Sequence, residues 1–471
     1  MLRTHTCGQL VAQDIGTQVT LCGWVGSRRD HGKIIFVDLR DRYGITQIVF
    51  APDNKQVYET AKQLGNEYVI LVQGKANQRP KGTENPKLNT GEIEILAEKL
   101  TILNASCGLP FEIKEDINVS GDLRLKYRYL DLRRKQALDN LLLRHNVYYA
   151  IRTFLNKQQF IDVETPILTR STPEGARDFL VPSRLLPGQF YALPQSPQLF
   201  KQILMIAGFD RYYQIARCFR DEDLRADRQP EFTQLDLEMS FVEQEDVFNL
   251  IEQLIQYVFA QVLGIKVAIP FPRLDFEQAI KQYQTDKPDL RDSKNKQAQF
   301  AFVWVTGFPL FKYDENEKRW VSEHHPFTAP EGGDVDLSGN SFKNKKALAY
   351  DLVLNGTEIG SGSIRIHQPQ LQEKIFKIIG IDEQEAIARF GFLIEALKYG
   401  APPHGGFAIG IDRFLSLLVN EKTIREIIAF PKTQSGWCLL TDAPSAVDKK
   451  QLEELNLQIK DQIKSVRSGE M

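Results

Sequence analysis

Apolar and polar residues alternate in five strand-length segments between residues 17 and 103. The segments read VTLCGWV, KIIFVDLRD, ITQIVFA, EYVILVQGKA and EIEILAEKLTIL, and Gly, Asp, Asn and Pro turns separate them. Such alternation is typical of strands that bury one face. An amphipathic helix is predicted at residues 54–64, before the fourth segment. This order predicts a small β-barrel of the OB type, a fold whose strand face and loops bind oligonucleotides.

Two further strands with a charged loop between them are predicted at residues 211–241. The arms RYYQIARCFR and EFTQLDLEMSF have strand composition, and the loop is rich in Asp, Arg, Gln and Pro. Because side chains alternate across a strand, the second arm has one polar face and one apolar face. The polar row is Phe232, Gln234, Asp236, Glu238 and Ser240. The apolar row packs on a core, so the polar row lines either solvent or a site.

The rest of the chain mixes long helical patterns with isolated strands and lacks a regular βαβ rhythm. This predicts an α+β domain built on an antiparallel sheet. A segment of low periodicity with Pro110 and Gly121 separates it from the barrel. We predict a barrel domain at 1–105, a hinge at 106–133 and the α+β domain at 134–471. The hinge segment DLRLKYRYLDLRRK alternates basic and apolar residues, which is typical either of a cationic strip facing RNA or of a solvated face.

The composition is that of an ordinary globular protein, with 42% hydrophobic and 25% charged residues. The formal net charge of -2 neither favours nor excludes RNA binding. The five cysteines are scattered singly, which disfavours a zinc site and suits a reducing cytoplasm. The most apolar run, residues 300–311, is too short to cross a bilayer. We therefore expect a cytoplasmic protein that makes no membrane contact.

Three motifs occur in the order and spacing of a known family. A helix and strand ending in proline, LLLRHNVYYAIRTFLNKQQFIDVETP, occupies residues 141–166, FRDEDLRADRQPEFTQ occupies 219–234, and GGFAIGIDRF occupies 405–414. They resemble motifs 1, 2 and 3 of the class II aminoacyl-tRNA synthetases, in the form of the bacterial aspartate enzymes, and the similarity runs along nearly the whole chain. The sequence contains no HIGH-type or KMSKS-type signature, no G-x-x-x-x-G-K-[ST] loop and no G-x-G-x-x-G turn.

The resemblance implies that ATP and Mg²⁺ are used to activate L-aspartate, which is then transferred to tRNA(Asp). The substrate carboxylate is the nucleophile, so catalysis would rest on positioning and on cations that stabilise the phosphorus oxygens. Arg220 and Arg413 are the implied catalytic arginines, and Arg228 is placed near the outer phosphates. The other implied ATP-binding residues are Asp221, Glu222, Gln229, Glu358, Gly410, Ile411 and Asp412. Glu358 and Asp351 are the implied ligands of Mg²⁺, which prefers hard oxygen donors.

The residues alone also support a bound anion near Arg413. This arginine begins the apolar helical segment RFLSLLVN, where a cation opposes the helix dipole. The alternative is an exposed arginine that pairs with Asp412.

A pocket for aspartate must offset the desolvation of a carboxylate with fixed positive groups. Arg365 and Lys201 are the predicted donors, and Asp236 is predicted to take the substrate ammonium group. Two cations that face the neutral amide of asparagine would lack a balancing negative charge, so asparagine is disfavoured as the substrate. Lysine is disfavoured as the substrate even more strongly. By resemblance, the remaining aspartate contacts are Glu174, Gln198, Arg220 and His324, and His325 is expected to share the role of His324. A histidine pair before proline is otherwise typical of a turn.

In the barrel, the candidate anticodon-reading residues are Arg28, Phe36 and Gln47, which offer a cation, a ring for stacking and an amide. In the family, the positions that resemble His31 and Gly82 are tied to which tRNA anticodon the enzyme accepts. Members with these residues, instead of leucine and lysine, accept both tRNA(Asp) and tRNA(Asn). The resemblance therefore implies that both tRNAs are charged, with strict specificity for tRNA(Asp) as the alternative.

Two more expectations come from the family. The bacterial enzymes carry an inserted domain after a segment like YQTDKPDLR, whereas here only a short polar linker, residues 292–299, follows it. The motif 1 helix forms the dimer interface in this class, which implies a homodimer; a core helix of a monomer is the alternative. A non-catalytic tRNA-binding relative is disfavoured, because such a protein has no need of the residues retained here. They are Arg220, Glu358, Arg365 and Arg413.

Overall fold

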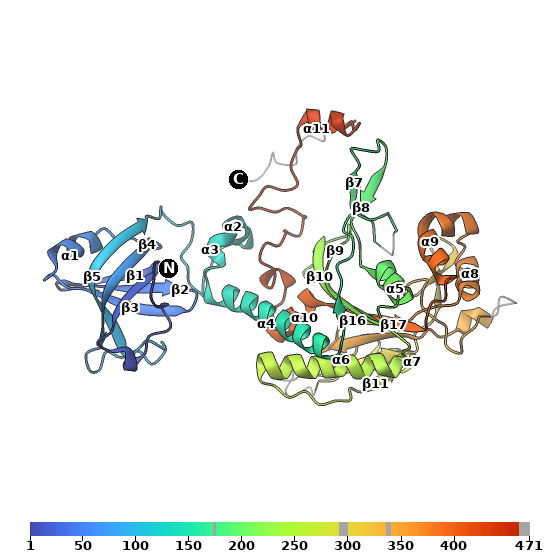
Figure 1. The fold of residues 1–471 in the computed structure, drawn as a ribbon, viewed down its shortest axis with the longest axis horizontal. Coiled ribbons are helices and arrows are strands. Elements are labelled where there is room, and N and C mark those ends of the chain that lie inside the picture. Colours follow the sequence, from blue (N-terminus) through green and yellow to red (C-terminus); the bar gives the residue numbers. More distant parts are fainter. Residues whose placement is uncertain (173–175, 292–299, 336–340, 461–471) are drawn as a thin grey trace. The chain divides into compact units, whose positions relative to one another are not determined.

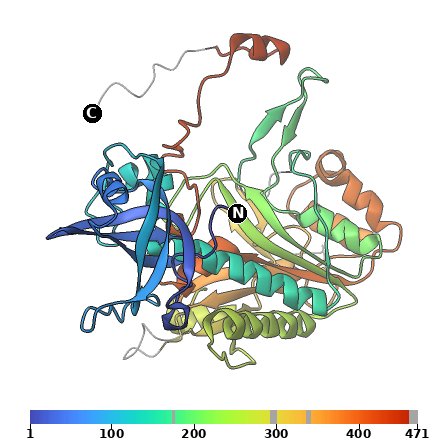
Figure 2. The ribbon, with the colours of Figure 1, turned by 60° about the vertical axis from the view of Figure 1, so that its left-hand side comes forward.

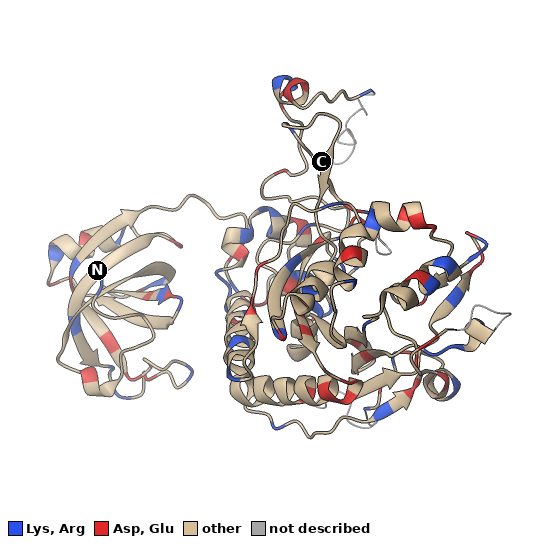
Figure 3. Ribbon diagram, turned by 45° about the vertical axis from the view of Figure 1, so that its right-hand side comes forward, with Lys and Arg blue, Asp and Glu red and all other residues tan. Residues whose placement is uncertain are grey.

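The computed structural model describes residues 1–172, 176–291, 300–335 and 341–460 (Figure 1). The chain divides into two compact units, Met1–Leu138 and Asp139–Met471. Basic and acidic residues are interspersed along the ribbon of both units (Figure 3). Within the described ranges, every helix is too short or too polar to cross a membrane.

Five strands of the first unit close into a barrel, in the order β1-β2-β3-β5-β4. They are β1 (Gln18–His31), β2 (Ile34–Asp41), β3 (Gly44–Phe50), β4 (Val69–Gln78) and β5 (Ile93–Asn104). The helix α1 (Lys55–Ala61) lies between β3 and β4 in the sequence, as predicted. Alternate residues such as Val19, Leu21 and Val25 point into the core and are buried. The predicted OB-type barrel is confirmed.

The basic segment after the barrel folds inward. Two short helices follow β5, α2 (Gly121–Lys126) and α3 (Arg128–Asp131). The buried carboxylate of Asp131 accepts hydrogen bonds from Arg124 Nε at 2.8 Å, from Arg134 NH1 at 2.9 Å and from Arg128. Burial would raise the pKa of Asp131, but the three arginines hold it below its usual value. These arginines therefore neutralise an internal carboxylate, and both sequence-based alternatives, a strip facing RNA and a solvated face, are wrong for them.

An eight-stranded sheet forms the centre of the second unit, in the order β11-β12-β15-β16-β17-β10-β9-β6. The strands are β6 (Ile161–Asp162), β9 (Arg211–Phe219), β10 (Glu231–Ser240), β11 (Arg273–Asp275), β12 (Phe302–Thr306), β15 (Ala349–Leu354), β16 (Thr357–Ile364) and β17 (His404–Gly410). The predicted antiparallel pairing is confirmed for the inner strands. At the two edges, β11 pairs parallel with β12 and β6 pairs parallel with β9. Each parallel pair is joined through a helix, as a parallel crossover requires.

Helices cover both faces of this sheet (Figures 1 and 2). One face packs against α4 (Lys135–Lys157), α6 (Gln244–Val258) and α10 (Ile411–Leu418), and the other against α5 (Gln198–Ile206), α7 (Phe276–Tyr283), α8 (Pro369–Ile378) and α9 (Glu383–Leu397). In β10, Leu235, Leu237 and Met239 belong to the first core. Because side chains alternate, the polar row of β10 faces the α5 side of the sheet.

The sequence of α6 shows why a helix forms at this face. The backbone N–H of Glu243 donates to Asp246 Oδ2 at 2.9 Å, which is half of a reciprocal capping box. Residues 247, 248, 251, 254, 255 and 258 are apolar and buried, with the spacing of one helix face. The remaining elements are β7 (Leu180–Pro182), β8 (Phe190–Ala192), β13 (Phe311–Asp314), β14 (Arg319–Ser322) and α11 (Lys449–Glu454).

Candidate active site

The polar row of β10 lies inside the protein. Asp236 is 1% exposed and Glu238 is fully buried. Alternate residues of a strand are about 7 Å apart, so the row extends along the sheet face from Phe232 to Glu238. Its first two members, Phe232 and Gln234, line a cavity, and the next two belong to a buried cluster of charges. The predicted alternative of a solvent-facing row is wrong.

The charge cluster unites the two predicted carboxylate donors. Lys201 Nζ, from α5, lies 3.1 Å from Asp236 Oδ1 and 3.5 Å from Glu238 Oε2. Arg365 follows β16, and its Nε and NH2 donate to the two carboxylate oxygens of Glu238 at 2.9 and 3.2 Å. Glu238 therefore bridges the ammonium and the guanidinium. Sequence reasoning assigned Glu238 no role, although its place in the polar row was the available signal.

The two carboxylates of the cluster have different electrostatic states. Burial would raise the pKa of Glu238, but Arg365 and Lys201 hold it below the usual value. Burial raises the pKa of Asp236, and Lys201 only partly offsets the effect. Asp236 Oδ2 has no hydrogen-bond partner among the described residues. Because an unsatisfied buried carboxylate oxygen is costly, Asp236 can accept a cationic ligand group.

A glycine of the third motif makes room for Glu238. Gly406 in β17 pairs with Glu238 across the sheet. A Cβ at position 406 would lie 1.8 Å from Glu238 Oε2. Only glycine therefore allows the strands to pair with the carboxylate between them.

The two adjacent histidines differ in charge preference. His325 Nε2 lies 2.7 Å from Arg365 NH1, and burial and Arg365 hold the pKa of His325 far below its usual value. His324 Nε2 lies 3.4 Å from Asp351 Oδ1. Burial would lower the pKa of His324, but the nearby carboxylate of Asp351 raises it. His325 is thus neutral beside the charge cluster, whereas His324 binds a proton more readily than an ordinary histidine.

The helix α5 carries a second polar residue to the cluster. Gln198 and Lys201 are one helical turn apart, so they share a face of α5. Gln198 is 6% exposed, and its Nε2 has no partner among the described residues. A buried free amide donor beside Lys201 suits a substrate contact. Glu174, another predicted aspartate contact, lies outside the described residues.

A cavity of about 450 Å³ adjoins the polar row and brings most of the predicted ATP-binding residues together. Its lining includes Arg220, Glu222, Arg228, Gln229, Phe232, Gln234, Lys287, Glu358, Gly410, Asp412 and Arg413. Two predicted members lie elsewhere. Asp221 lines a neighbouring cavity, and the side chain of Ile411 is fully buried in the core under the sheet.

The two implied catalytic arginines both face this cavity. The guanidinium of Arg220 lies 5.0 Å from the centre of the Phe232 ring. Arg413 NH1 donates to the backbone oxygen of Glu358 at 2.9 Å, and NH2 donates to Asp227 at 3.2 Å. The buried Nε atoms of Arg220 and Arg413 have no partner among the described residues. Unsatisfied donors in a cavity suit an anionic ligand.

Asp412 does not pair with Arg413. Its carboxylate instead binds Arg144 at 2.5 Å and the backbone N–H of Thr233 at 2.8 Å. The alternative in which Arg413 is held by Asp412 is therefore wrong. Arg144 was not predicted as part of the site, because no local pattern shows what a helix arginine reaches.

The two predicted magnesium ligands lie on neighbouring strands. Glu358 Oε2 is 2.9 Å from Lys287 Nζ, and Asp351 is 5% exposed beside His324. Among the described residues, there is no cluster of three or more His, Cys, Asp or Glu side chains suited to a metal. Magnesium commonly takes one or two carboxylates and completes its octahedron with phosphates and water, so two carboxylates fit that mode.

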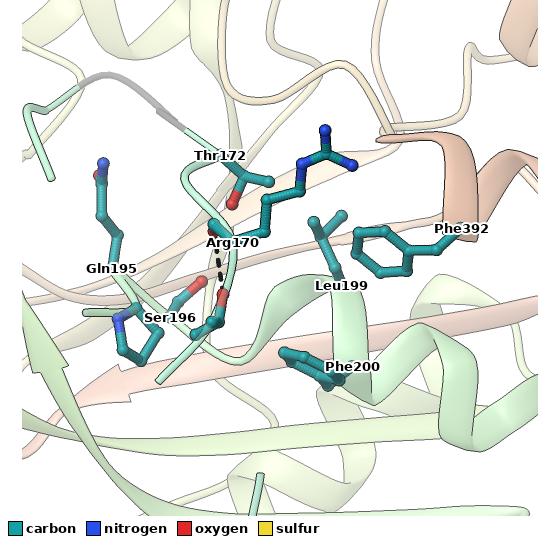
Figure 4. Close-up of a pocket in the computed structure, with 9 residues that line it drawn as sticks. Arg170, Thr172, Gln195, Ser196, Leu199, Phe200 and Phe392 are labelled. Atoms are coloured by element: carbon teal, nitrogen blue, oxygen red, sulfur yellow. Dashed lines mark hydrogen bonds between the residues drawn. The ribbon is translucent and has the colours of Figure 1, made fainter. Parts of the chain in front are cut away.

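A smaller cavity of about 220 Å³ lies beside α5 (Figure 4). Leu199 and Phe200 of α5 line it, together with Phe392 of α9 and Arg170. The rings of Phe200 and Phe392 are stacked at 6.2 Å.

The predicted anticodon-reading residues lie on the outer surface of the barrel. Gln47 Nε2 donates to Glu94 at 2.9 Å, and Gln47 Oε1 accepts from Arg29 at 3.4 Å. Phe36 is the cross-strand partner of Arg29. Sequence reasoning missed Arg29 and Glu94, although the alternation of β1 and β5 places both outside. This face offers a ring, an amide and charges of both signs, a set that suits base recognition.

Of the other predicted barrel residues, Arg28 and His31 lie toward the end of β1, and Gly82 lies between β4 and β5. Arg28 binds Asp30 at 2.7 and 3.0 Å and the backbone oxygen of Lys62 at 2.6 Å. His31 is exposed at the end of β1. Gly82 has φ +88°, and a Cβ there would meet nothing within 4 Å. The space beside Gly82 is therefore open.

Two family models match this chain. The OB-fold nucleic acid binding domain matches residues 19–103, and the class II tRNA synthetases (D, K and N) match residues 120–434, more than half of the chain. The chain belongs to the class II tRNA synthetases. The synthetase domain covers motifs 1, 2 and 3 and therefore the cavity and the charge cluster.

Several relatives of this synthetase align along nearly the whole chain. A protein of Dictyoglomus turgidum named aspartate–tRNA(Asp/Asn) ligase is 47% identical over 98% of both chains. A protein of the same name from Caldanaerobacter subterraneus is 45% identical over 97% of this chain and 98% of its own. The asparaginyl-tRNA synthetase from Pyrococcus horikoshii complexed with asparaginyl-adenylate matches the structure with a TM-score of 0.74 at 24% identity, over 92% of this chain and 99% of that one. The last similarity supports the fold alone.

The synthetase is shorter than its relatives. The alignment with the Dictyoglomus protein runs over 582 positions, whereas this chain has 471 residues. The relative therefore carries a stretch of domain size that has no counterpart here. The predicted place of the missing insertion, residues 292–299, lies outside the described residues.

Proposed function

We propose that this synthetase is an aspartate–tRNA ligase that activates L-aspartate with ATP and transfers it to tRNA(Asp) and tRNA(Asn). Relatives that are 44–47% identical along the whole chain are named for this reaction. The observation that carries the choice of amino acid is the buried pair of cations, Lys201 and Arg365, held together by Glu238.

The charge cluster accounts for selection of aspartate. Without substrate, two cations face two carboxylates, and the site is balanced. Aspartate adds an ammonium group, which Asp236 accepts through Oδ2, and carboxylates, which Lys201 and Arg365 receive. The NH2 group of Arg365 has one acceptor among the described residues and carries two hydrogens, so one donor is left for the substrate. Gln198 and the neutral His325 add neighbouring polar contacts.

The competing amino acids fit this cluster less well. Asparagine would turn an amide N–H₂ toward cationic donors, and lysine would add a third cation. An asparagine enzyme is the runner-up, since asparaginyl-tRNA synthetases share the fold. The non-catalytic alternative has little support from a cavity that keeps both unsatisfied arginine donors.

ATP would occupy the 450 Å³ cavity. Phe232 offers a ring for the adenine, and Glu222 and Gln229 offer polar contacts to the nucleoside. Arg220 and Arg413 present free Nε–H donors to the phosphates. The substrate carboxylate attacks the α-phosphorus, the bond to the bridging oxygen breaks, and pyrophosphate leaves with the electron pair. Catalysis then consists of alignment and of charge stabilisation at the phosphorus oxygens.

Magnesium would be held by Glu358 and Asp351 with the nucleotide phosphates. The ion pair between Lys287 and Glu358 supports this assignment, because it shows that a cation can lie against the carboxylate of Glu358. When bound, the ion supplies charge that offsets the negative phosphates. Glu174 is proposed to contact the substrate ammonium from its loop, and His324 is proposed to lie near the substrate carboxylates.

The barrel is proposed to read the anticodon. We assign this role to residues 1–105, a hinge to 106–133 and catalysis to 134–471. Phe36 and Gln47 on the outer face, with Arg28, are the proposed contacts to bases or backbone. His31 at an exposed hairpin end can bond to either of two bases, and Gly82 leaves space that a larger side chain would fill. These two residues support acceptance of both tRNAs.

A cytoplasmic homodimer is proposed. All five cysteines are free thiols, as a reducing compartment favours. The helix α4 buries Val147, Ile151 and Phe154 in its own core, so motif 1 serves the monomer fold as well. Exposed apolar residues that support a dimer surface follow the helix closely: Ile161, Ile167 and Leu168. Light scattering of the purified protein should give twice the monomer mass of 53.9 kDa.

Two assays test the proposal. Pyrophosphate–ATP exchange should depend on aspartate and show little response to asparagine or lysine. Charging of purified tRNA(Asp) and tRNA(Asn) should then attach aspartate to both. Exchange driven by asparagine would favour an asparagine enzyme. Binding of tRNA without exchange would favour a non-catalytic protein. Charging of tRNA(Asp) alone would restrict the proposed tRNA specificity to tRNA(Asp).

A further inference from the structure

A lysine outside the three motifs reaches the nucleotide cavity. Lys287 lies in the loop after α7 and lines the cavity with the arginines of motifs 2 and 3. Its Nζ is 2.9 Å from Glu358 Oε2. The side chains of Lys287 and Glu358 are 41% and 26% exposed, so both remain within reach of a ligand.

The loop of Lys287 is anchored against the turn that precedes Glu358. Asn355 and Gly356 join β15 to β16 with φ of +53° and +80°, the geometry of a two-residue hairpin turn. A Cβ on Gly356 would lie 3.3 Å from Asp289 Cβ and 3.7 Å from the backbone oxygen of Lys287. Close packing of the two loops therefore fixes the base of the lysine, while its four-carbon stem stays free to turn.

Three cations that line the cavity are each paired with a carboxylate. Arg228 binds Glu222 at 3.0 Å, Arg413 binds Asp227 at 3.2 Å, and Lys287 binds Glu358. A triphosphate brings several negative charges to these carboxylates. Glu358 would repel it unless a cation remained nearby.

We propose that Lys287 is a phosphate-binding residue of the nucleotide site and occupies the cation position at Glu358 while the site is empty. The inference rests on the proposed function for the identity of the nucleotide. When ATP enters, the ammonium turns from Glu358 to the phosphate oxygens, and Glu358 becomes open to a divalent ion. Lysine suits this exchange better than arginine, because its compact charge is not locked to a carboxylate by a planar fork.

ATP binding in EDTA separates this role from that of the metal. Calorimetric titration with ATP, without aspartate, tRNA or divalent ions, should show about tenfold weaker binding for Lys287→Met, the loss of one charge-assisted contact. Glu358→Gln should bind metal-free ATP more tightly than the wild type, because it removes a negative charge and releases the lysine. Lys287→Arg should retain most of the affinity. The matched control is Lys281→Met, since Lys281 is an exposed residue of α7 away from the cavity lining.

Two outcomes would overturn the inference. One is metal-free ATP affinity of Lys287→Met equal to that of the Lys281→Met control. The other is loss of affinity in Glu358→Gln as large as in Lys287→Met, which would indicate a structural ion pair. Adding Mg²⁺ should reduce the difference in ATP affinity between Lys287→Met and the wild type, because Glu358 is then open to the ion. The titration measures the binding of nucleotide alone. If the wild-type protein binds ATP but shows no aspartate-dependent exchange, the proposed function is wrong, whereas the role of Lys287 in ATP binding is still supported.

Discussion

Arg144 of α4 donates to Asp412 of α10 at 2.5 Å, and this one contact joins motif 1 to motif 3. Arg144 NH2 also donates to Thr233 Oγ1 in β10 at 2.9 Å, and Asp412 accepts the backbone N–H of Thr233. One guanidinium therefore connects all three motifs. Because Asp412 directly precedes Arg413, the contact also fixes the start of the helix that presents Arg413 to the nucleotide cavity.

Replacing Arg144 should weaken nucleotide use and stability together. Arg144→Met leaves the carboxylate of Asp412, whose side chain is 4% exposed, without its charged partner. We expect a loss of about 3 kcal/mol in the free energy of unfolding, as for other broken buried pairs. The KM for ATP should rise about tenfold if the start of α10 shifts enough to lose one charged contact. Urea unfolding and pyrophosphate exchange measure the two effects.

Arg152→Met is the matched control for this prediction. Arg152 lies on the same helix, is 48% exposed and pairs with Asp162 at 3.5 Å. Its removal should change stability by less than about 0.5 kcal/mol. Equal effects of the two substitutions on the KM for ATP would contradict a special role for Arg144.

Glu238→Gln should destabilise the empty protein and make it unusually responsive to aspartate. The amide leaves Lys201 and Arg365 with too little negative charge, at a cost of about 3–5 kcal/mol. Bound aspartate supplies a carboxylate, so it should raise the melting temperature of Glu238→Gln more than that of the wild type. Thermal scans with and without aspartate give the comparison. A similar ligand-induced shift in both proteins would argue that the two cations do not face the substrate.

The KM for aspartate should rise as the pH falls, at a higher pH than an ordinary aspartate side chain would impose. Burial raises the pKa of Asp236, so this carboxylate takes a proton early in the acid range and loses its attraction for the substrate ammonium. Asp236→Asn should have a high KM throughout and lack the acid limb. Pyrophosphate exchange measured across the acid and neutral range tests this. If the KM for aspartate of Asp236→Asn still rises at acid pH as in the wild type, another group causes the pH dependence, and His324 is the first one to examine.

His31→Leu and Gly82→Lys should reduce charging of tRNA(Asn) more than charging of tRNA(Asp). Leucine removes the hydrogen bonds of an exposed histidine, and lysine fills the open space beside residue 82. The substitution at Gly82 also strains a backbone with φ +88°, at about 1 kcal/mol. The ratio of kcat/KM for the two tRNAs is the measurement, and Lys33→Met on the same hairpin is the control. A ratio that stays the same would remove these residues from tRNA choice.

Alternation along the strands allowed much of this fold to be predicted. The barrel strands, the helix after the third strand and the two faces of β10 follow from side-chain periodicity, which is a local property. The edge strand β11 was not predicted, and β6 was expected only through the resemblance to motif 1, since the two strands have three and two residues and no alternation to detect. The arginines after the barrel were misjudged for a related reason: a basic pattern does not reveal a buried acidic partner such as Asp131.

By itself, the sequence determined that Asp236 and Glu238 share a face, and it predicted that the arginines of motifs 2 and 3 belong to one site. The tertiary structure alone decided what stands opposite that face. Lys201 comes from a helix 35 residues before Asp236, and Arg365 comes from a strand end 127 residues after Glu238. Local periodicity specifies which way a side chain points, whereas the partner it meets depends on how distant segments pack. Only that packing shows that Glu238 holds the two cations together.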